Sequence, residues 1–193
     1  MRTVEYRRFG NLDLQVSVLG FGAMRLPLSG EACEAIDREE ARRMLHRAID
    51  LGVNYVDTAY PYHGGESEPW LGWALKDGYR ERVTIATKLP AWKVGHRDDF
   101  DRLLDEQTTR LDTMVDLYLL HGLDETSWRD NVLAHDVLAS AERALADGRI
   151  GHLGFSFHDS YDVFVRILDG SDLWDFCQIQ YNYMDEEYQA GTR

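Results

Sequence analysis

The chain has 193 residues, of which 44% are hydrophobic and 28% are charged, so it is long enough to bury a substantial core and is typical of a globular protein. Its 21 basic and 34 acidic residues give a net charge of −13, which disfavours binding to nucleic acid or to an anionic membrane surface. We expect one domain over residues 1–193, with no nucleic-acid partner and no membrane partner.

The sequence carries no targeting or disulfide signal. Met1-Arg-Thr-Val-Glu-Tyr-Arg-Arg8 lacks the apolar segment of a signal peptide, and no stretch approaches the roughly 20 apolar residues that span a bilayer. We therefore expect a cytoplasmic protein. The two cysteines, Cys33 and Cys177, fit neither a zinc nor an iron–sulfur spacing, so we expect reduced thiols and no bound metal.

The first elements are short. Residues 6–10 and 14–18 read as two strands joined by the turn Gly10-Asn-Leu-Asp13, which predicts a β-hairpin. The glycine-punctuated apolar run that follows predicts the first strand of a larger sheet at residues 19–24. A polar loop containing Cys33 comes next.

Strand and helix then alternate. Asp37-Arg-Glu-Glu40 is a helix-start pattern, and the helix after it is predicted to end at Gly52 and to carry one apolar face made by Ala41, Met44, Leu45, Ala48 and Ile49. Further helices are predicted at residues 67–76, 99–111, 135–146 and 160–168. Further strands are predicted at residues 53–57, 83–87, 115–120, 152–157 and 176–180.

Repeated strand–helix units with apolar strands indicate an α/β protein with a parallel sheet, which is either a doubly wound open sheet or a (β/α)8 barrel. Polar residues at the ends of five successive strands decide between them. In a barrel these ends converge on one mouth, whereas in an open sheet the outer ones lie well apart. The sequence therefore predicts a TIM-type barrel, and the polar strand-end residues are Asp57, Lys88, His121, Ser156 and Gln178.

Asp57, Tyr62, Lys88 and His121 are the candidate catalytic residues. Burying a carboxylate, a phenol, an ammonium and an imidazole costs free energy unless the groups pair with one another. Tyr62 can donate a proton, Lys88 can make that phenol more acidic, Asp57 can neutralise Lys88, and His121 can orient a substrate oxygen. Each residue alone has an ordinary structural explanation, such as a turn, a cap or a core histidine, so the prediction rests on the set.

Several motifs, taken together, resemble those of the aldo-keto reductases and occur in order over nearly the whole chain. They are Gly20-Phe-Gly22, Asn54-Tyr-Val-Asp-Thr-Ala-Tyr-Pro-Tyr62, Thr87-Lys88, Leu120-His121, Gly154-Phe-Ser156 and Gln178-Ile-Gln180. The stretches at residues 60–68, 154–160 and 174–183 are similar to a subgroup that often carries a C-terminal ferredoxin-like iron–sulfur domain, which this sequence does not include.

The resemblance implies reduction of an aldehyde or ketone to an alcohol with NADPH, or with NADH as the alternative, acting on a small-molecule carbonyl substrate. By motif position Tyr62 is the proton donor, and Asp57, Lys88 and His121 complete the tetrad. Ser156 and Gln178 match positions that bind the nicotinamide carboxamide. Gly22, Ala23 and Met24 match the loop against which the nicotinamide ribose lies, so the implied cofactor-binding set is Gly22, Ala23, Met24, Asp57, Ser156 and Gln178.

The resemblance also implies eight strand–helix units, whereas about six are visible before Arg193. In the family the last two units supply the aromatic side chain that stacks on the nicotinamide and the basic residues that hold the cofactor phosphates. We therefore expect an incomplete barrel: a fragment, a split half completed by another polypeptide, or a truncated gene product. The activity of the isolated chain is left open by the sequence.

The sequence leaves two other functions open. A noncatalytic binding or assembly module would pair through its open sheet edge with itself or with a complementing chain. A metal-dependent barrel hydrolase would use Asp57, His63, Glu66 and His121 as ligands, and it ranks last because no His-x-His spacing supports it. His63, Trp92 and His158 lie in the same loops and are further substrate-contact candidates.

Overall fold

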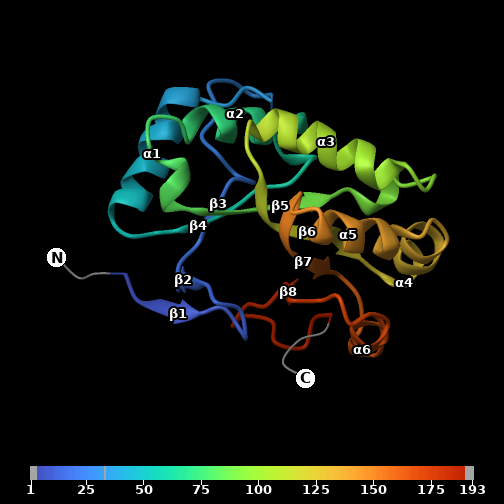
Figure 1. Ribbon diagram of the computed structural model, residues 1–193. Coiled ribbons are helices and arrows are strands. Elements are labelled where there is room, and N and C mark those ends of the chain that lie inside the picture. The colour runs from blue at the N-terminus through green and yellow to red at the C-terminus, as the bar shows by residue number, and fades with distance from the viewer. Residues whose placement is uncertain (1–3, 33, 190–193) are drawn as a thin grey trace. The chain divides into compact units, whose positions relative to one another are not determined.

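The structure is a computed structural model that describes residues 4–32 and 34–189 (Figure 1). Two compact units make up the chain. The first contains the residues up to Thr87 together with Asp105–Asp116, and the second contains Lys88–Leu104 and the residues from Leu117 onward. Cys33 lies outside the described residues.

The main sheet has six strands in the order β3-β4-β5-β6-β7-β8, which is also their order in the chain. The pairings of β3 with β4, of β4 with β5 and of β7 with β8 are parallel. A doubly wound sheet reverses its strand order at a switch point, so a sequential order confirms the predicted barrel-type sheet. The strands are Phe21–Gly22, Tyr55–Asp57, Thr84–Leu89, Val115–Leu123, Ile150–Phe157 and Phe176–Ile179.

In the first unit, β1 (Tyr6–Arg8) and β2 (Gln15–Ser17) form the predicted antiparallel hairpin. Two reciprocal hydrogen bonds tie it to the sheet. The Ser17 backbone N–H donates to Asn54 Oδ1 at 2.7 Å, and the Asn54 backbone N–H donates to Ser17 Oγ at 3.0 Å. The hairpin is therefore anchored directly before β4.

Helices α1 (Arg38–Asp50) and α2 (Ser67–Ala74) lie side by side in the first unit (Figure 1). The Asp37 side chain caps α1 by accepting from the Glu40 backbone N–H, as the sequence pattern predicts. Ala41, Leu45 and Ile49 are buried, but Met44 is 46% exposed, so its prediction as an inward residue is wrong. It lies at the edge of the apolar face.

A close backbone approach joins α2 to the end of α3 (Asp99–Leu111). A Cβ at Gly72 would lie 2.4 Å from the Leu111 carbonyl oxygen, so only glycine allows this contact. On α3, Phe100, Leu103 and Leu104 are fully buried, which confirms the predicted apolar stripe.

The second unit is rich in aromatic packing. Its helices are α4 (Glu125–Ser127), the π-helical turn η4 (Trp128–Leu133), α5 (Val137–Ala146) and α6 (Tyr161–Asp169). The Trp174 ring lies 5.0 Å from Phe155 and 6.1 Å from Trp128, measured between ring centroids. This cluster joins η4 to the segment that leads into β8.

Some elements differ from prediction. The first sheet strand is shorter than residues 19–24, and α5 begins at Val137 rather than at residue 135, because Asp136 has a left-handed φ of 53°. The helical residues between 125 and 133 were not predicted. The short helices η2 (Arg80–Arg82) and η3 (Ala91–Lys93) precede and follow β5. Within residues 4–32 and 34–189, no helix is both long enough and apolar enough to cross a bilayer.

Candidate functional site

The first unit brings Gly22, Ala23 and Asp57 together. Gly22 is in register with Asp57 in the parallel pair β3–β4, and the Ala23 backbone N–H donates to the Asp57 carbonyl at 2.8 Å. A Cβ added at Gly22 would meet no atom within 4 Å, so there is open space beside this glycine. Ala23 is fully buried, and Met24 is 53% exposed.

Tyr62 begins the short helical turn η1 (Tyr62–Gly65), which follows β4 by a few residues. The next residue, buried His63, has a left-handed φ of 53°, and its Nε2 accepts from the Leu26 backbone N–H at 3.1 Å. This contact fastens the Tyr62 turn to the loop after β3. Gly64 and Gly65 complete the turn.

The Tyr62 phenol is half-buried, and burial, followed by the negative charge of Asp57, raises its pKa to about 12. The phenol is therefore protonated at neutral pH and able to donate. Tyr55, two residues before Asp57 on the same face of β4, also has a raised pKa because of burial and then Asp57. Tyr55 was not among the predicted site residues, although its period-two spacing from Asp57 was a usable signal.

The second unit holds Lys88 and His121. Lys88 is on β5 and is only 2% exposed, and His121 is on β6. Burial first, and then the positive charge of Lys88 and the proximity of His158, lower the His121 pKa to about 3. The imidazole is therefore neutral at ordinary pH and can act as a hydrogen-bond donor without adding charge. The exposed Trp92 ring lies 5.2 Å from the His121 ring.

Ser156 and Gln178 lie opposite each other in the parallel pair β7–β8. Ser156 is 5% exposed, and its Oγ accepts from the Gly122 backbone N–H at 2.7 Å, which leaves the hydroxyl hydrogen as a donor. The Gln178 side chain offers both an amide donor and a carbonyl acceptor. A hydroxyl and a carboxamide in register form a donor and acceptor set that fits a carboxamide ligand.

The predicted site residues thus occur in two groups, one in each compact unit, and each lies on a strand of the main sheet or in the loop that follows one. Asp57 and Tyr62 interact in the first unit, and Lys88 and His121 interact in the second. The meeting of all four around one substrate stays a prediction. Among the described residues there is no group of three or more His, Cys, Asp or Glu side chains that could hold a metal ion.

Sequence reasoning missed a fully buried carboxylate, Glu68, on α2. Its Oε1 accepts from Thr87 Oγ1 at 2.6 Å and from Gln107 Nε2 at 2.6 Å, and its Oε2 lies 3.4 Å from Arg110. The signal was present, because Glu68 shares the helical face of Leu71 and Leu75 by its spacing of three and seven residues.

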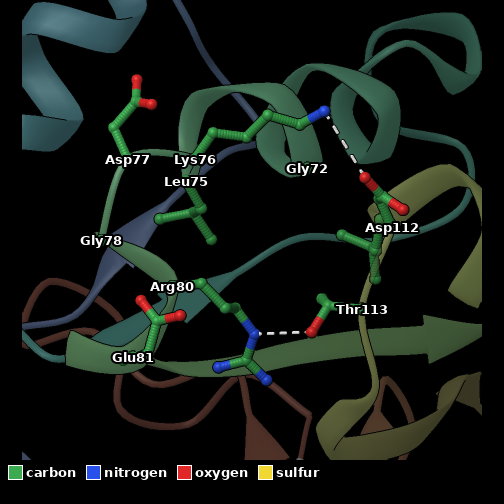
Figure 2. A pocket seen from close by; sticks show the side chains of 10 residues that line it. Gly72, Leu75, Lys76, Asp77, Gly78, Arg80, Glu81, Asp112 and Thr113 are labelled. Atoms are coloured by element: carbon green, nitrogen blue, oxygen red, sulfur yellow. Dashed lines mark hydrogen bonds and ion pairs between the residues drawn. The ribbon is translucent and has the colours of Figure 1, made fainter.

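A cavity of about 300 Å³ lies before the amino ends of β5 and β6, in the first unit (Figure 2). Lys76 forms an ion pair with Asp112 across it at 3.5 Å. Arg80 donates to Thr113 Oγ1, to the Val83 and Met114 carbonyls and to Asp116, at 2.9–3.0 Å. Within the first unit, Asp57 ends β4, whereas the residues that line this cavity lie before the amino ends of β5 and β6.

Comparison with known proteins identifies the family. Residues 18–192 match the Aldo/keto reductase family, so the chain belongs to that family. It is 30% identical over 176 residues to L-galactose dehydrogenase of Arabidopsis thaliana, an alignment that covers 88% of this chain and 53% of that protein. This confirms the resemblance that the sequence motifs indicated.

Solved structures agree. The holo form of an aldo-keto reductase from Bacillus halodurans is 28% identical, with a TM-score of 0.72 and coverage of 92% of this chain and 58% of that chain. An aldo/keto reductase from Klebsiella pneumoniae, solved in complex with NADP and acetate, is 27% identical, with a TM-score of 0.61 and coverage of 80% and 50%. The chain spans about half the length of the curated relatives it matches.

Proposed function

We propose that the protein reduces an aldehyde or ketone to an alcohol by hydride transfer from NADPH, with NADH as the alternative donor. The observation that carries this proposal is the pair of protonation states in the candidate site. The Tyr62 phenol is held protonated, and the His121 imidazole is held neutral beside the buried Lys88 ammonium. These are the states that proton donation to a carbonyl oxygen needs.

Each candidate residue has one role in this reaction. Hydride arrival at the carbonyl carbon builds negative charge on the carbonyl oxygen, and Tyr62 donates its phenolic proton to that oxygen. Lys88 stabilises the phenolate that remains, and Asp57 neutralises Lys88. Neutral His121 orients the substrate oxygen by donating a hydrogen bond. A phenol with a pKa raised to about 12 by burial and by Asp57 is a weak acid, so its proton transfer needs a positive charge to stabilise the phenolate, which is the role proposed for Lys88.

The nicotinamide supplies the hydride when it is bound. Ser156 and Gln178 would hold its carboxamide, because their donor and acceptor groups match that group. The open space beside Gly22, with Ala23, Met24 and Asp57 around it, would accept the ribose. The NADP-bound Klebsiella relative supports this choice of cofactor. A small-molecule carbonyl compound is the proposed substrate, and the cytoplasm is the proposed location.

The test is a turnover assay on the purified chain with NADPH and then NADH, using a panel of aldehydes and ketones that includes a nitrobenzaldehyde. We expect nicotinamide consumption that is lost in Tyr62→Phe, with cofactor binding, followed by nicotinamide fluorescence, retained. Tyr181→Phe is the matched control, because Tyr181 is an exposed phenol after β8. Turnover that survives in Tyr62→Phe would exclude Tyr62 as the proton donor.

We also propose a second candidate, an assembly module that pairs through the edge of β8. Its support is the set of exposed apolar side chains on and after this strand. Ile179 is 40% exposed, Tyr181 is 54%, Tyr183 is 83% and Met184 is 80%. An edge strand beside exposed aromatic groups is a template for pairing with a second copy or with a complementing chain.

A further inference from the structure

The first two residues of α2 contact the segments around three strand ends. Ser67 Oγ lies 2.8 Å from Thr58 Oγ1 and donates to the Ala23 carbonyl at 3.1 Å. Glu68 Oε1 accepts from Thr87 Oγ1 at 2.6 Å. Ser67, Glu68, Thr58 and Thr87 are all fully buried or nearly so.

Each of these partners adjoins a candidate site residue. Thr58 follows Asp57 directly, Thr87 precedes Lys88 directly, and Ala23 belongs to the loop proposed to face the ribose. On a strand, successive side chains point to opposite faces, so Thr87 can reach α2 while Lys88 points the other way. A hydrogen bond on the outer face of β5 therefore fixes the position of the ammonium on the inner face.

Burying Glu68 is costly. Burial raises its pKa, and the hydrogen bonds from Thr87 and Gln107 and the charge of Arg110 act against that shift. Apolar packing of Glu68 and its partners together would avoid this cost, since replacing a whole buried ion pair by apolar groups is often neutral or stabilising. The carboxylate provides something that apolar packing does not: directional acceptors that fix Thr87 and Gln107 together.

We propose that Glu68 is a positioning residue for the reduction, acting through the Thr87 hydroxyl to hold Lys88 where it assists Tyr62. Ser67 does the same for Asp57 through Thr58. Neither residue touches the substrate. The inference rests on the proposed function for its catalytic consequence, while the contacts that carry it belong to the first unit alone.

The test compares two substitutions at Thr87. Thr87→Val keeps the volume and removes the hydroxyl, and Thr87→Ser keeps the hydroxyl and removes a methyl group. If the hydrogen bond positions Lys88, kcat falls about 10- to 100-fold in Thr87→Val, with little change in KM, and Thr87→Ser restores most of it. If Thr87 serves only packing, Thr87→Ser is the more damaged variant, and the proposal is overturned.

Thr84→Val is the matched control. Thr84 lies on the same strand and is 9% exposed, and its hydroxyl has no hydrogen bond among the described residues. We expect kcat and KM to remain within about twofold of wild type, since removing this hydroxyl breaks no hydrogen bond. An equal fall of kcat in Thr84→Val and Thr87→Val would show a general effect of altering β5 and would overturn the proposal.

A second readout needs no turnover. The amide hydrogens of Lys88 and Leu89 are expected to exchange at least tenfold faster in Thr87→Val and in Glu68→Gln than in wild type, and at the wild-type rate in Thr87→Ser. A wild-type chain that does not reduce carbonyl compounds would contradict the proposed function. The same exchange pattern would still support the role of Glu68 and Thr87 in positioning Lys88. Unchanged amide exchange in Thr87→Val would overturn the positioning role of Glu68 and Thr87, even if the wild-type chain is active.

Discussion

Replacing Lys88 tests whether this residue serves the reaction or the stability of the fold. It is 2% exposed on β5, and methionine matches its aliphatic stem without its charge. We expect Lys88→Met to abolish carbonyl reduction while the thermal midpoint changes by only a few degrees, equivalent to about 1 kcal/mol. The measurement is turnover together with a thermal melt followed by circular dichroism.

The matched control is Lys93→Met, because Lys93 is an exposed lysine in the following turn η3. It should keep full turnover. An unfolded Lys88→Met protein would instead show that the buried ammonium is chiefly structural, since breaking a buried ion pair costs roughly 3–5 kcal/mol. Retained turnover would contradict the role proposed for Lys88.

The lowered pKa of His121 predicts that the free energy of unfolding depends on pH. Its pKa is about 3 in the folded chain and 6.5 in its ordinary state, so the unfolded chain binds a proton that the folded chain does not between these values. Stability is complete above pH 6.5 and is lost as pH falls toward 3. At about 1.4 kcal/mol per pH unit, the loss from pH 6.5 to 4 is on the order of 3 kcal/mol.

The measurement is urea unfolding of wild type and His121→Asn at these two pH values. Asparagine has no charge to gain, so the variant should lose less stability on acidification, by on the order of 3 kcal/mol. The comparison cancels the carboxylates common to both proteins. Parallel pH curves for the two proteins would show that His121 is not held neutral by its surroundings.

At the scale of elements, Arg80 ties the amino ends of β5 and β6 together. It donates to two backbone carbonyls, to Thr113 and to Asp116, and Asp116 also accepts from the Ile85 backbone N–H at 2.7 Å (Figure 2 shows the Thr113 bond). We expect Arg80→Met to lower the free energy of unfolding by about 2–4 kcal/mol, because several acceptors lose a partner at once.

Arg82→Met is the comparison. Arg82 pairs with Asp50 at 2.9 Å, but both side chains are more than 40% exposed, so we expect a loss of at most about 1 kcal/mol. Chemical denaturation of both variants measures the difference. Equal losses would show that the Arg80 contacts are no stronger than an ordinary surface ion pair.

The elements that sequence could predict are those with local signals. The strands, the hairpin and α1 follow from apolar periodicity and from the Asp37 cap. The helical run at residues 125–133 could not be predicted, because it is stabilised by Trp128 packing on Trp174, which is far away in sequence. The helical spacing of Glu68 indicated that it faces the core, but its hydrogen-bond partners could not be predicted because they lie 19, 39 and 42 residues away.

In the candidate site too, sequence could predict the features that have local signals and could not predict those that depend on distant contacts. Motif spacing was enough to place Asp57, Lys88, His121, Ser156 and Gln178 on strands, because each directly ends or follows an apolar run. The protonation states of Tyr62 and His121 depend on burial and on neighbouring charges, which no local pattern encodes. The raised pKa of Tyr62 is therefore a result of the structure alone.

At the scale of the whole molecule, the net charge of −13 opposes association of two copies. If β8 is an assembly edge, light scattering should show oligomers that grow with protein concentration and with salt, because salt screens the repulsion. Ile179→Lys should remove them, since a lysine on an edge strand blocks pairing. Val18→Lys is the control, at an exposed apolar residue that follows the hairpin. A monomer under all conditions would exclude pairing of two copies through β8.

The paired indoles of Trp128 and Trp174 give the second unit a spectroscopic label of its own. Their rings lie 6.1 Å apart at 51°, close enough for their excited states to couple and produce a circular dichroism couplet. Thermal loss of this couplet reports the second unit, whereas the helical signal reports the entire chain. A single coincident transition would mean that the two units unfold cooperatively. Two separate transitions would mean that the two units unfold independently.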